Sequence, residues 1–219
     1  MGTGTDTQAP RLTLRERNRR QTRRALLDAA LEVFAEAGYG SASVENIAER
    51  AGAAKGTLYT YFPQGREQLF CELYEEINDE LIDTATAIHA AESGFVDRVV
   101  AMTSAVADVA ARPRLGRFYA IDDPSLDQAV TPVRGHASSV IAGYIAQDYA
   151  DLAPSTSRDG EPAADPQTVA ELLTGAMRTA LTSIAHGVRT SDDVTRAMRA
   201  LAEGLVVAAA RTDTATDPT

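Results

Sequence analysis

Apolar residues recur every three to four positions along almost the whole chain. The first such stripe consists of Leu27, Ala30, Leu31 and Phe34. It predicts an amphipathic helix that ends near Gly38. The same spacing returns at 95–106, 169–188 and 194–209. No segment alternates with the period of two that a strand requires, so the pattern predicts an all-α protein.

Two shorter helices follow the first stripe. Ser43 can cap a helix whose first turn contains Glu45, and Gly52 can end that helix. Only two alanines separate Gly52 from the segment KGTLYTYF at 55–62, which predicts a third helix. Three short helices, the last two joined by a tight glycine turn, indicate a helix-turn-helix unit.

The remaining pattern predicts a larger helical domain. Pro63 and Gly65 interrupt the chain before a helix over 66–91, and a further long helix is expected over 125–152. Residues 153–166 are short of apolar positions and rich in Pro, Ser and Asp, which predicts a loop.

The last two predicted helices, about 167–188 and 192–210, have the clearest period and form an expected antiparallel hairpin. Their apolar stripe is wide and rich in alanine, which favours close packing against more than one neighbour. The pattern permits two interpretations: part of the stripe is a dimer surface, or all of it is intramolecular core.

Composition adds a charge asymmetry. The 219 residues carry a net charge of −10, yet residues 1–62 contain nine Lys or Arg and only seven Asp or Glu. A basic N-terminal segment followed by an acidic remainder suggests a polyanionic partner. An arginine-rich helix start that is simply solvated is an equal alternative. The single cysteine, Cys71, and the lack of any long apolar run predict a cytoplasmic protein with no membrane segment.

The segment KGTLYTYF contains the only lysine of the chain. Leu58 and Phe62 lie four positions apart and can pack the third helix onto the first two. Lys55 and Thr60 then lie on other faces, as do Thr57 and Tyr61. Ammonium, hydroxyl and phenol groups are suited to phosphate oxygens and base edges, so the pattern predicts a DNA-reading helix. Whether Lys55 would contact a base or a phosphate stays open.

At this point a resemblance becomes visible. The run ALLDAALEVFAEAGYGSASVENIAERAGAAKGTLYTYFPQGREQLF, at 25–70, resembles the N-terminal domain of the TetR family of bacterial transcriptional regulators. The matching features are Ala30 and Phe34 before Gly38-Tyr39, Ser43 ahead of Ile47-Ala48, Ala51-Gly52, Gly56-Thr57-Leu58-Tyr59 and Tyr61-Phe62. The later residues resemble the family only in helical pattern and length.

The resemblance implies a three-helix DNA-binding domain at 1–63, an effector-binding and dimerisation domain at 64–211 and a disordered tail at 212–219. It implies a homodimer that binds a palindromic operator on double-stranded DNA, most often as a repressor released by a small effector. Carried over by position, the expected DNA-binding residues are Arg19, Arg20, Arg23, Ser43, Lys55, Gly56, Thr57, Tyr59, Thr60, Tyr61 and Arg66. Dimerisation is expected through the last two helices.

Two departures from the family pattern affect individual contacts. Ala53-Ala54 stands where the family commonly has Val-Ser, which removes an N-cap worth about 1 kcal/mol. The segment PQGRE replaces a shorter P-S-K-E, so the start of the fourth helix is expected to shift.

Candidate effector-binding residues lie in the acidic part of the chain after residue 62. An apolar pocket with a few polar groups is the expected site, and the candidates are Met102, Phe118, Tyr119, His136, Tyr144 and Met177. Ordinary core packing is the alternative for each. As a group they predict a small, partly apolar effector.

No cofactor, metal site or catalytic residue is expected, since the histidines lack ligand spacing and no nucleophile–base pair is present. Two rival classes of protein remain. One is a small helical enzyme, and the other is a module whose arginine-rich N-terminal segment binds a membrane surface or a protein partner. Selective binding to promoter DNA would separate them from a regulator.

Overall fold

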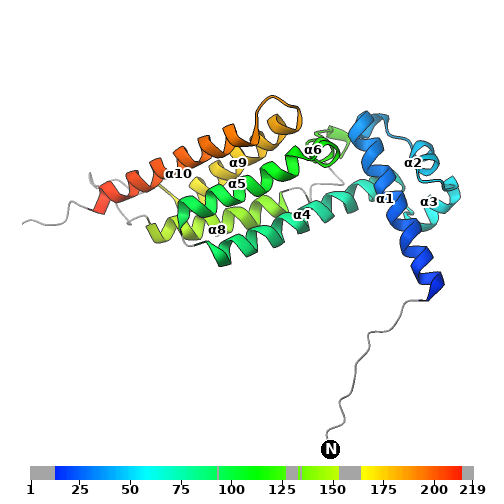
Figure 1. The fold of residues 1–219 in the computed structure, drawn as a ribbon, viewed down its shortest axis with the longest axis horizontal. Helices are drawn as coiled ribbons and strands as arrows, with labels where there is room; N and C mark the ends of the chain where they lie inside the picture. The colour runs from blue at the N-terminus through cyan, green and yellow to red at the C-terminus, as the bar shows by residue number, and fades with distance from the viewer. Residues whose placement is uncertain (1–12, 93, 127–132, 134, 153–163, 214–219) are drawn as a thin grey trace, which may run out of the picture.

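The computed structural model describes residues 13–92, 94–126, 133, 135–152 and 164–213, and every regular element in these ranges is helical (Figure 1). The elements are α1 (Leu14–Ser41), α2 (Val44–Arg50), α3 (Lys55–Tyr61), α4 (Arg66–Ala91), α5 (Phe95–Ala111), α6 (Pro113–Tyr119), the 3₁₀ turn η1 (Pro124–Leu126), α8 (His136–Leu152), α9 (Pro166–Ala185) and α10 (Ser191–Asp213). The all-α prediction is confirmed.

α1 begins with a reciprocal cap. The backbone N–H of Glu16 donates to the hydroxyl of Thr13 at 3.2 Å, and the N–H of Thr13 donates to the Glu16 carboxylate at 2.8 Å. Near its other end α1 kinks at Gly38, whose φ of 74° lies in the left-handed region that favours glycine. The stripe predicted to end at Gly38 therefore ends there in the structure, and one further turn leads into α2.

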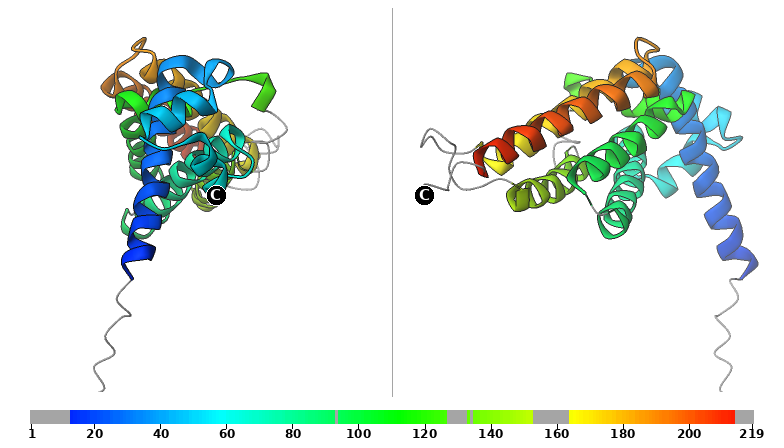
Figure 2. Two further views of the ribbon diagram at one scale, coloured as in Figure 1. Left: turned by 90° about the vertical axis from the view of Figure 1, so that its right-hand side faces the viewer. Right: turned by 60° about the vertical axis from the view of Figure 1, so that its left-hand side comes forward.

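α2 and α3 pack on α1 to form a small domain at one end of the molecule (Figure 1). Ile47 of α2, Leu58 of α3 and Phe62 after α3 are fully buried in the same hydrophobic core as Leu26 and Phe34 of α1. α1 projects beyond this domain, and its N-terminal turns lie farthest from the helical body (Figure 2).

The body consists of α4, α5, α8, α9 and α10, lying roughly side by side (Figure 1). α4 joins the two parts, since it packs on α1 at its start and on α5 and α8 farther along. α6 lies across the junction, in contact with α1, α5 and α9. Its Gly116 is required by space, because a Cβ there would lie 2.0 Å from the carbonyl oxygen of Ala110.

The predicted start of one helix is wrong. The expected helix over 125–152 is the 3₁₀ turn η1 followed, within the described residues, by turns at Val133 and Gly135, and α8 begins only at His136. Gly135 has a φ of 88°, which a continuous helix cannot accommodate. Residues 127–132 and 134 lie outside the described residues. So do most of the predicted loop, 153–163, and 214–219 of the predicted tail, whereas α10 extends through Asp213.

The last two predicted helices are present as α9 and α10, but each packs mainly on other helices of the body and not on the other member of the pair. α10 lies along α5 at the edge of the body, and α9 lies against α8 and α5 (Figure 2). Met198 and Ala202, on one side of α10, are buried. The large apolar side chains left exposed here are Leu172, at 70% of its surface, Val188 at 64%, Leu201 at 55% and Val207 at 49%. One side of the predicted stripe is thus core and another faces outward.

Candidate nucleic-acid interface

The turn between α2 and α3 fixes the direction of α3. The N–H of Gly52, with a φ of 64°, donates to Glu49 at 3.0 Å, and the N–H of Ala53 donates to Ala48 at 2.9 Å. These bonds close the end of α2 and turn the chain within four residues. α3 then begins without a side-chain cap, as the alanine at position 54 predicts.

α3 buries one face and exposes the other. Leu58 has no exposed surface, whereas Lys55, Gly56, Tyr59 and Thr60 are exposed. Thr57 and Tyr61 are half-buried at the border between the faces. The prediction is thus confirmed for buried Leu58 and for exposed Lys55 and Thr60, whereas Thr57 and Tyr61, expected to face outward, are only partly exposed. Tyr59 is 42% exposed and its ring packs on Gly65, where a Cβ would lie 3.2 Å from Cε1.

Lys55 is not a free cation. Its ammonium donates to the carboxylate of Glu45 on α2, and both side chains are more than half exposed. This hydrogen bond raises the pKa of Lys55 and lowers that of Glu45. Because the pair faces solvent, screening keeps it weak, so a competing anion can take the lysine.

Ser43 and Thr60 both use their hydroxyl groups locally. Ser43 accepts a hydrogen bond from the N–H of Asn46 at 3.1 Å and so caps α2. Thr60 donates to the carbonyl of Gly56 at 2.9 Å, one turn earlier in α3. Both residues remain exposed, and each oxygen keeps capacity for a further partner.

An open groove runs between the start of α1 and the end of α3. It is lined by Leu14, Arg15, Glu16, Asn18, Arg19, Thr22, Thr60 and Tyr61. Arg19 thus lies on the same groove as Thr60 and Tyr61, the last two residues of α3. Arg15, Asn18 and Thr22 were not predicted as site residues. Their spacing of three and four positions on one helix face was the signal available in the sequence.

Arg20 is exposed near the same end of α1, within no ion pair among the described residues. Arg23 and Arg66 are placed differently from the prediction. Arg23 pairs with Glu72 of α4, and its guanidinium lies 5.0 Å from the ring centroid of Phe62. It therefore ties α1 to α4.

Arg66 is also engaged inside the molecule. Its guanidinium lies 4.6 Å from the ring centroid of Tyr39 and donates to the carbonyls of Tyr39 at 3.3 Å and Ala42 at 2.9 Å. It holds the end of α1 against the start of α4. Arg23 and Arg66 are accordingly left out of the interface proposed below.

A cavity of about 520 Å³ lies in the body. Its apolar wall consists of Leu81, Val106, Ile141, Met177 and Leu181, and its polar lining residues are Asp122, Ser138, Thr174, Arg178, Thr179, Thr182 and Ser183. The hydroxyls of the four α9 serine and threonine residues in this set donate to carbonyls of the preceding turn. Tyr119 also lines it. The Tyr119 hydroxyl donates to Asn78 at 2.7 Å, and burial raises its pKa.

Of the six predicted effector residues, only Tyr119 and Met177 line this cavity. Met102 and Phe118 are fully buried in core, and His136 is exposed. Tyr144 lies elsewhere, stacked on His89 with ring centroids 4.3 Å apart. The hydroxyl residues of α9 were missed, because a serine or threonine on a helix carries no sign of facing inward.

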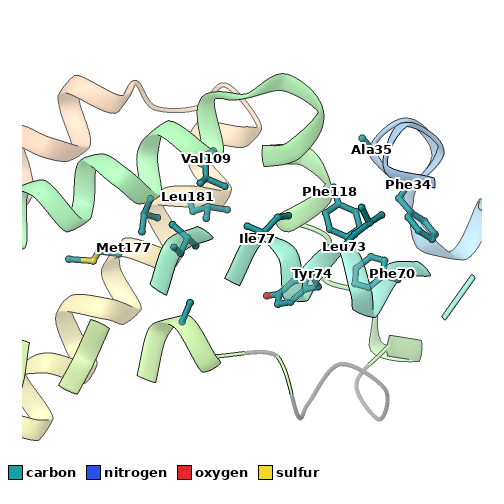
Figure 3. Close-up of a cluster of buried hydrophobic side chains, with 14 of the residues drawn as sticks. Phe34, Ala35, Phe70, Leu73, Tyr74, Ile77, Val109, Phe118, Met177 and Leu181 are labelled. Atoms are coloured by element: carbon teal, nitrogen blue, oxygen red, sulfur yellow. The ribbon is translucent and has the colours of Figure 1, made fainter. Parts of the chain in front are cut away.

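Phe118 connects the two domains instead. Its ring centroid lies 5.9 Å from that of Phe34 in α1 and 4.7 Å from that of Phe70 in α4 (Figure 3). The next residue, Tyr119, lines the cavity and stacks on Tyr74 at 4.6 Å. The cavity wall and the core of the N-terminal domain are therefore adjacent in the chain and in space.

The described residues offer little for metal or thiol chemistry. There is no cluster of three His, Cys, Asp or Glu in these ranges that could hold a metal ion. Burial raises the pKa of the Cys71 thiol, which disfavours the reactive thiolate. None of the described helices is long and apolar enough to cross a bilayer.

Comparison with known proteins agrees with this geometry. Residues 26–73 match the family described as bacterial regulatory proteins, tetR family. The fatty acid metabolism regulator protein of Bacillus subtilis is 41% identical over 58 residues, which are 26% of this chain and 29% of that protein. The transcriptional repressor KstR of Mycolicibacterium smegmatis is 28% identical over 158 residues, covering 70% of this chain and 72% of that protein.

Solved structures extend the likeness to the whole fold. The fatty acid degradation regulator FadR of Bacillus halodurans gives a TM-score of 0.67 at 19% identity and covers 84% of this chain and 94% of that one. FadR of Bacillus subtilis in complex with stearoyl-CoA gives 0.66 at 19% identity, covering 84% and 97%. Residues 26–73 are therefore a tetR-family domain, whose helix-turn-helix is formed by α2 and α3, and the described chain shares the fold of the regulators named above.

Proposed function

We propose that this protein is a sequence-specific DNA-binding transcriptional regulator, acting as a repressor that leaves a palindromic operator when a small effector binds. The observation that carries the proposal is that α3 has one buried face and one exposed face. Leu58 is sealed in the core while Lys55, Tyr59 and Thr60 are presented to solvent on a rigid helix. Such a face, on the second helix of a helix-turn-helix, is suited to the major groove.

The groove beside α3 supports a second point of contact. Arg15 and Arg19 of α1 face it together with Thr60 and Tyr61. A DNA backbone lying in the groove would meet guanidinium groups on one side and hydroxyl groups on the other, which are the side chains that commonly bind phosphate. The −10 net charge of the whole chain does not oppose this, because the acidic excess lies after residue 62.

The operator is proposed to be palindromic because we propose that the protein is a homodimer, whose two identical subunits bind identical half-sites. The apolar side chains of α9 and α10 that no described residue covers, Leu172 and Leu201 among them, would pack against the same helices of a second copy. A two-fold dimer would present two α3 helices to half-sites about 34–36 Å apart.

The cavity between α4, α5, α8 and α9 is the proposed effector site. Its volume of about 520 Å³ and its apolar wall with a hydroxyl rim fit a small, partly apolar molecule. Two of the similar proteins are named as regulators of fatty acid metabolism or degradation, and one solved structure is a complex with stearoyl-CoA. An effector can release DNA only by binding more tightly to the form that does not fit the operator.

A gel-shift experiment tests the proposal. The full chain is mixed at moderate salt with DNA from upstream of its own gene, with an excess of unrelated duplex as competitor. The proposal predicts a shift that survives the competitor and that a double variant, Lys55→Ala with Tyr61→Phe, loses. A shift that unrelated DNA removes equally well would contradict it and favour a general polyanion-binding module.

A further inference from the structure

The turn between α1 and α2 is held from two sides by segments outside the N-terminal domain. On one side Arg66, the first residue of α4, donates to the carbonyls of Tyr39 and Ala42 and lies 3.5 Å from that of Gly40. This turn leads directly into Ser43, which caps α2. Its position therefore helps to set the position of the helix-turn-helix.

Asp123 holds the other side of the turn. Its carboxylate lies beside the turn, since a Cβ added at Gly40 would lie 3.4 Å from Oδ2 of Asp123. Hydrogen bonds from Ser125 and, to a smaller extent, the nearby Gly40 backbone lower the pKa of Asp123. The second oxygen, Oδ1, accepts from the N–H of Ser125 at 2.9 Å and from its hydroxyl at 2.6 Å. These bonds, together with the buried Leu126, fix the orientation of the carboxylate.

The segment that bears Asp123 also lines the cavity. Tyr119, Ala120, Ile121 and Asp122 all lie on its wall, immediately before Asp123. A movement of this wall by one or two ångströms would therefore move the Asp123 carboxylate relative to Gly40. No helix lies between the cavity and the turn along this path, whereas the path through α4 runs along the packed side chains of Tyr74 and Phe70.

We propose that Asp123 is a positioning residue that links the cavity to the helix-turn-helix through the Gly40 turn. With the cavity empty, Asp123 and Arg66 hold the turn between an anion and a cation and keep α2 and α3 in place. An occupant that displaces residues 119–122 withdraws the carboxylate and loosens the turn. The inference rests on the proposed function, because it assigns the regulation of that same site.

Hydrogen exchange measured on the full chain without DNA tests the link. In Asp123→Ala, amides of residues 39–50 should exchange about three- to tenfold faster than in the unsubstituted protein, while those of α9 stay unchanged. Asp79→Ala is the matched control. It removes the same carboxylate from an exposed position of α4, so residues 39–50 should exchange at the original rate.

Two tryptophan variants test the coupling to the cavity. The chain contains no tryptophan, so the indole emission of Ser138→Trp or Leu181→Trp reports directly on entry into the apolar cavity. Filling the cavity should speed exchange at 39–50, and adding Asp123→Ala should produce no further increase. Unchanged exchange at 39–50 in Asp123→Ala would overturn the link, and unchanged exchange in both tryptophan variants would overturn the coupling.

These readouts require no operator. If the gel shift fails while exchange responds as described, the proposed function is wrong and the link stands. If DNA binds selectively and exchange does not respond, the regulator remains and Asp123 has no positioning role.

Discussion

Lys55 on α3 forms an ion pair with Glu45 on α2, so the only lysine of the chain meets a competing carboxylate within its own helix-turn-helix. The ammonium of Lys55 has further N–H groups for a DNA phosphate, but the negative charge of Glu45 competes with that phosphate. The pair therefore sets how strongly the exposed face of α3 attracts DNA.

Glu45→Gln should strengthen DNA binding. The substitution frees the ammonium of Lys55 and removes a negative charge from the surface that meets phosphate, so we expect affinity to rise by about two- to fivefold. Glu75→Gln removes the same charge from an exposed position on α4 and serves as the control. Fluorescence anisotropy at several salt concentrations measures both. An equal effect of the two variants would mean that net charge alone is responsible.

Lys55→Ala should weaken operator binding while leaving the oligomeric state intact. If Lys55 contacts phosphate, affinity for all sequences falls alike and the slope of log K against log salt decreases in magnitude by about one. If it contacts a base, preference relaxes at one operator position by about 1–3 kcal/mol. Titrations with operator and single-position variants distinguish the two. Unchanged binding would remove Lys55 from the interface.

Gly116→Ala should destabilise the junction of α5 and α6. The new Cβ would lie 2.0 Å from the carbonyl oxygen of Ala110, so the two helices must separate, at a cost of about 3 kcal/mol in the free energy of unfolding. Gly143→Ala is the control, because Gly143 is exposed on α8 and nothing lies within 4 Å of its added Cβ. It should stabilise the protein by about 0.5–1 kcal/mol. Urea unfolding measures both, and equal midpoints would contradict the close approach.

The ion pair between Arg98 of α5 and Asp148 of α8 should matter for stability mainly when it is broken. The Asp148 side chain is only 5% exposed, and His89 Nδ1 lies 3.8 Å from its Oδ1. Asp148→Ala leaves the Arg98 charge without its ion-pair partner, with only the bond from Arg98 Nε to the carbonyl of Glu92 at 2.8 Å remaining. It should cost about 3 kcal/mol in the free energy of unfolding. Replacing both, with Arg98→Met and Asp148→Leu, should recover most of that loss. A double variant as unstable as Asp148→Ala would show that the pair itself stabilises the fold.

Leu172→Glu and Leu201→Glu should convert a dimer to a monomer. Both side chains are more than half exposed in the single chain, and a charge placed there could not be buried against a second copy. Leu152→Glu, on an exposed leucine of α8, is the control and should remain dimeric. Sedimentation velocity measures the species present. A monomeric unsubstituted protein would refute the proposed dimer.

The sequence was sufficient for features that depend on local spacing. The two faces of α3 follow from Leu58 and Phe62 four positions apart, and the kink at Gly38 follows from a glycine at the end of an apolar stripe. Both are set by helical geometry and by the backbone freedom of one residue, which need no knowledge of distant partners.

Features that depend on long-range contacts were not predictable from the sequence. Arg23 and Arg66 have the charge expected of DNA-binding residues, but their partners are Glu72 and the carbonyls beside Tyr39. Composition gives the type of a side chain and not which group it meets across a folded chain. His136 illustrates the same limit, because its exposure depends on where α8 begins after the turn at Gly135.

Selection from a random pool of duplex DNA is the measurement that tests the central claim most directly. The full chain is immobilised, bound DNA is amplified over several rounds at moderate salt, and the enriched sequences are compared with those retained by Lys55→Ala with Tyr61→Phe. The proposed function predicts a two-fold symmetric motif whose half-sites lie about one helical turn apart, with enrichment lost in the double variant. A pool that stays random, or the same motif from both proteins, would contradict it.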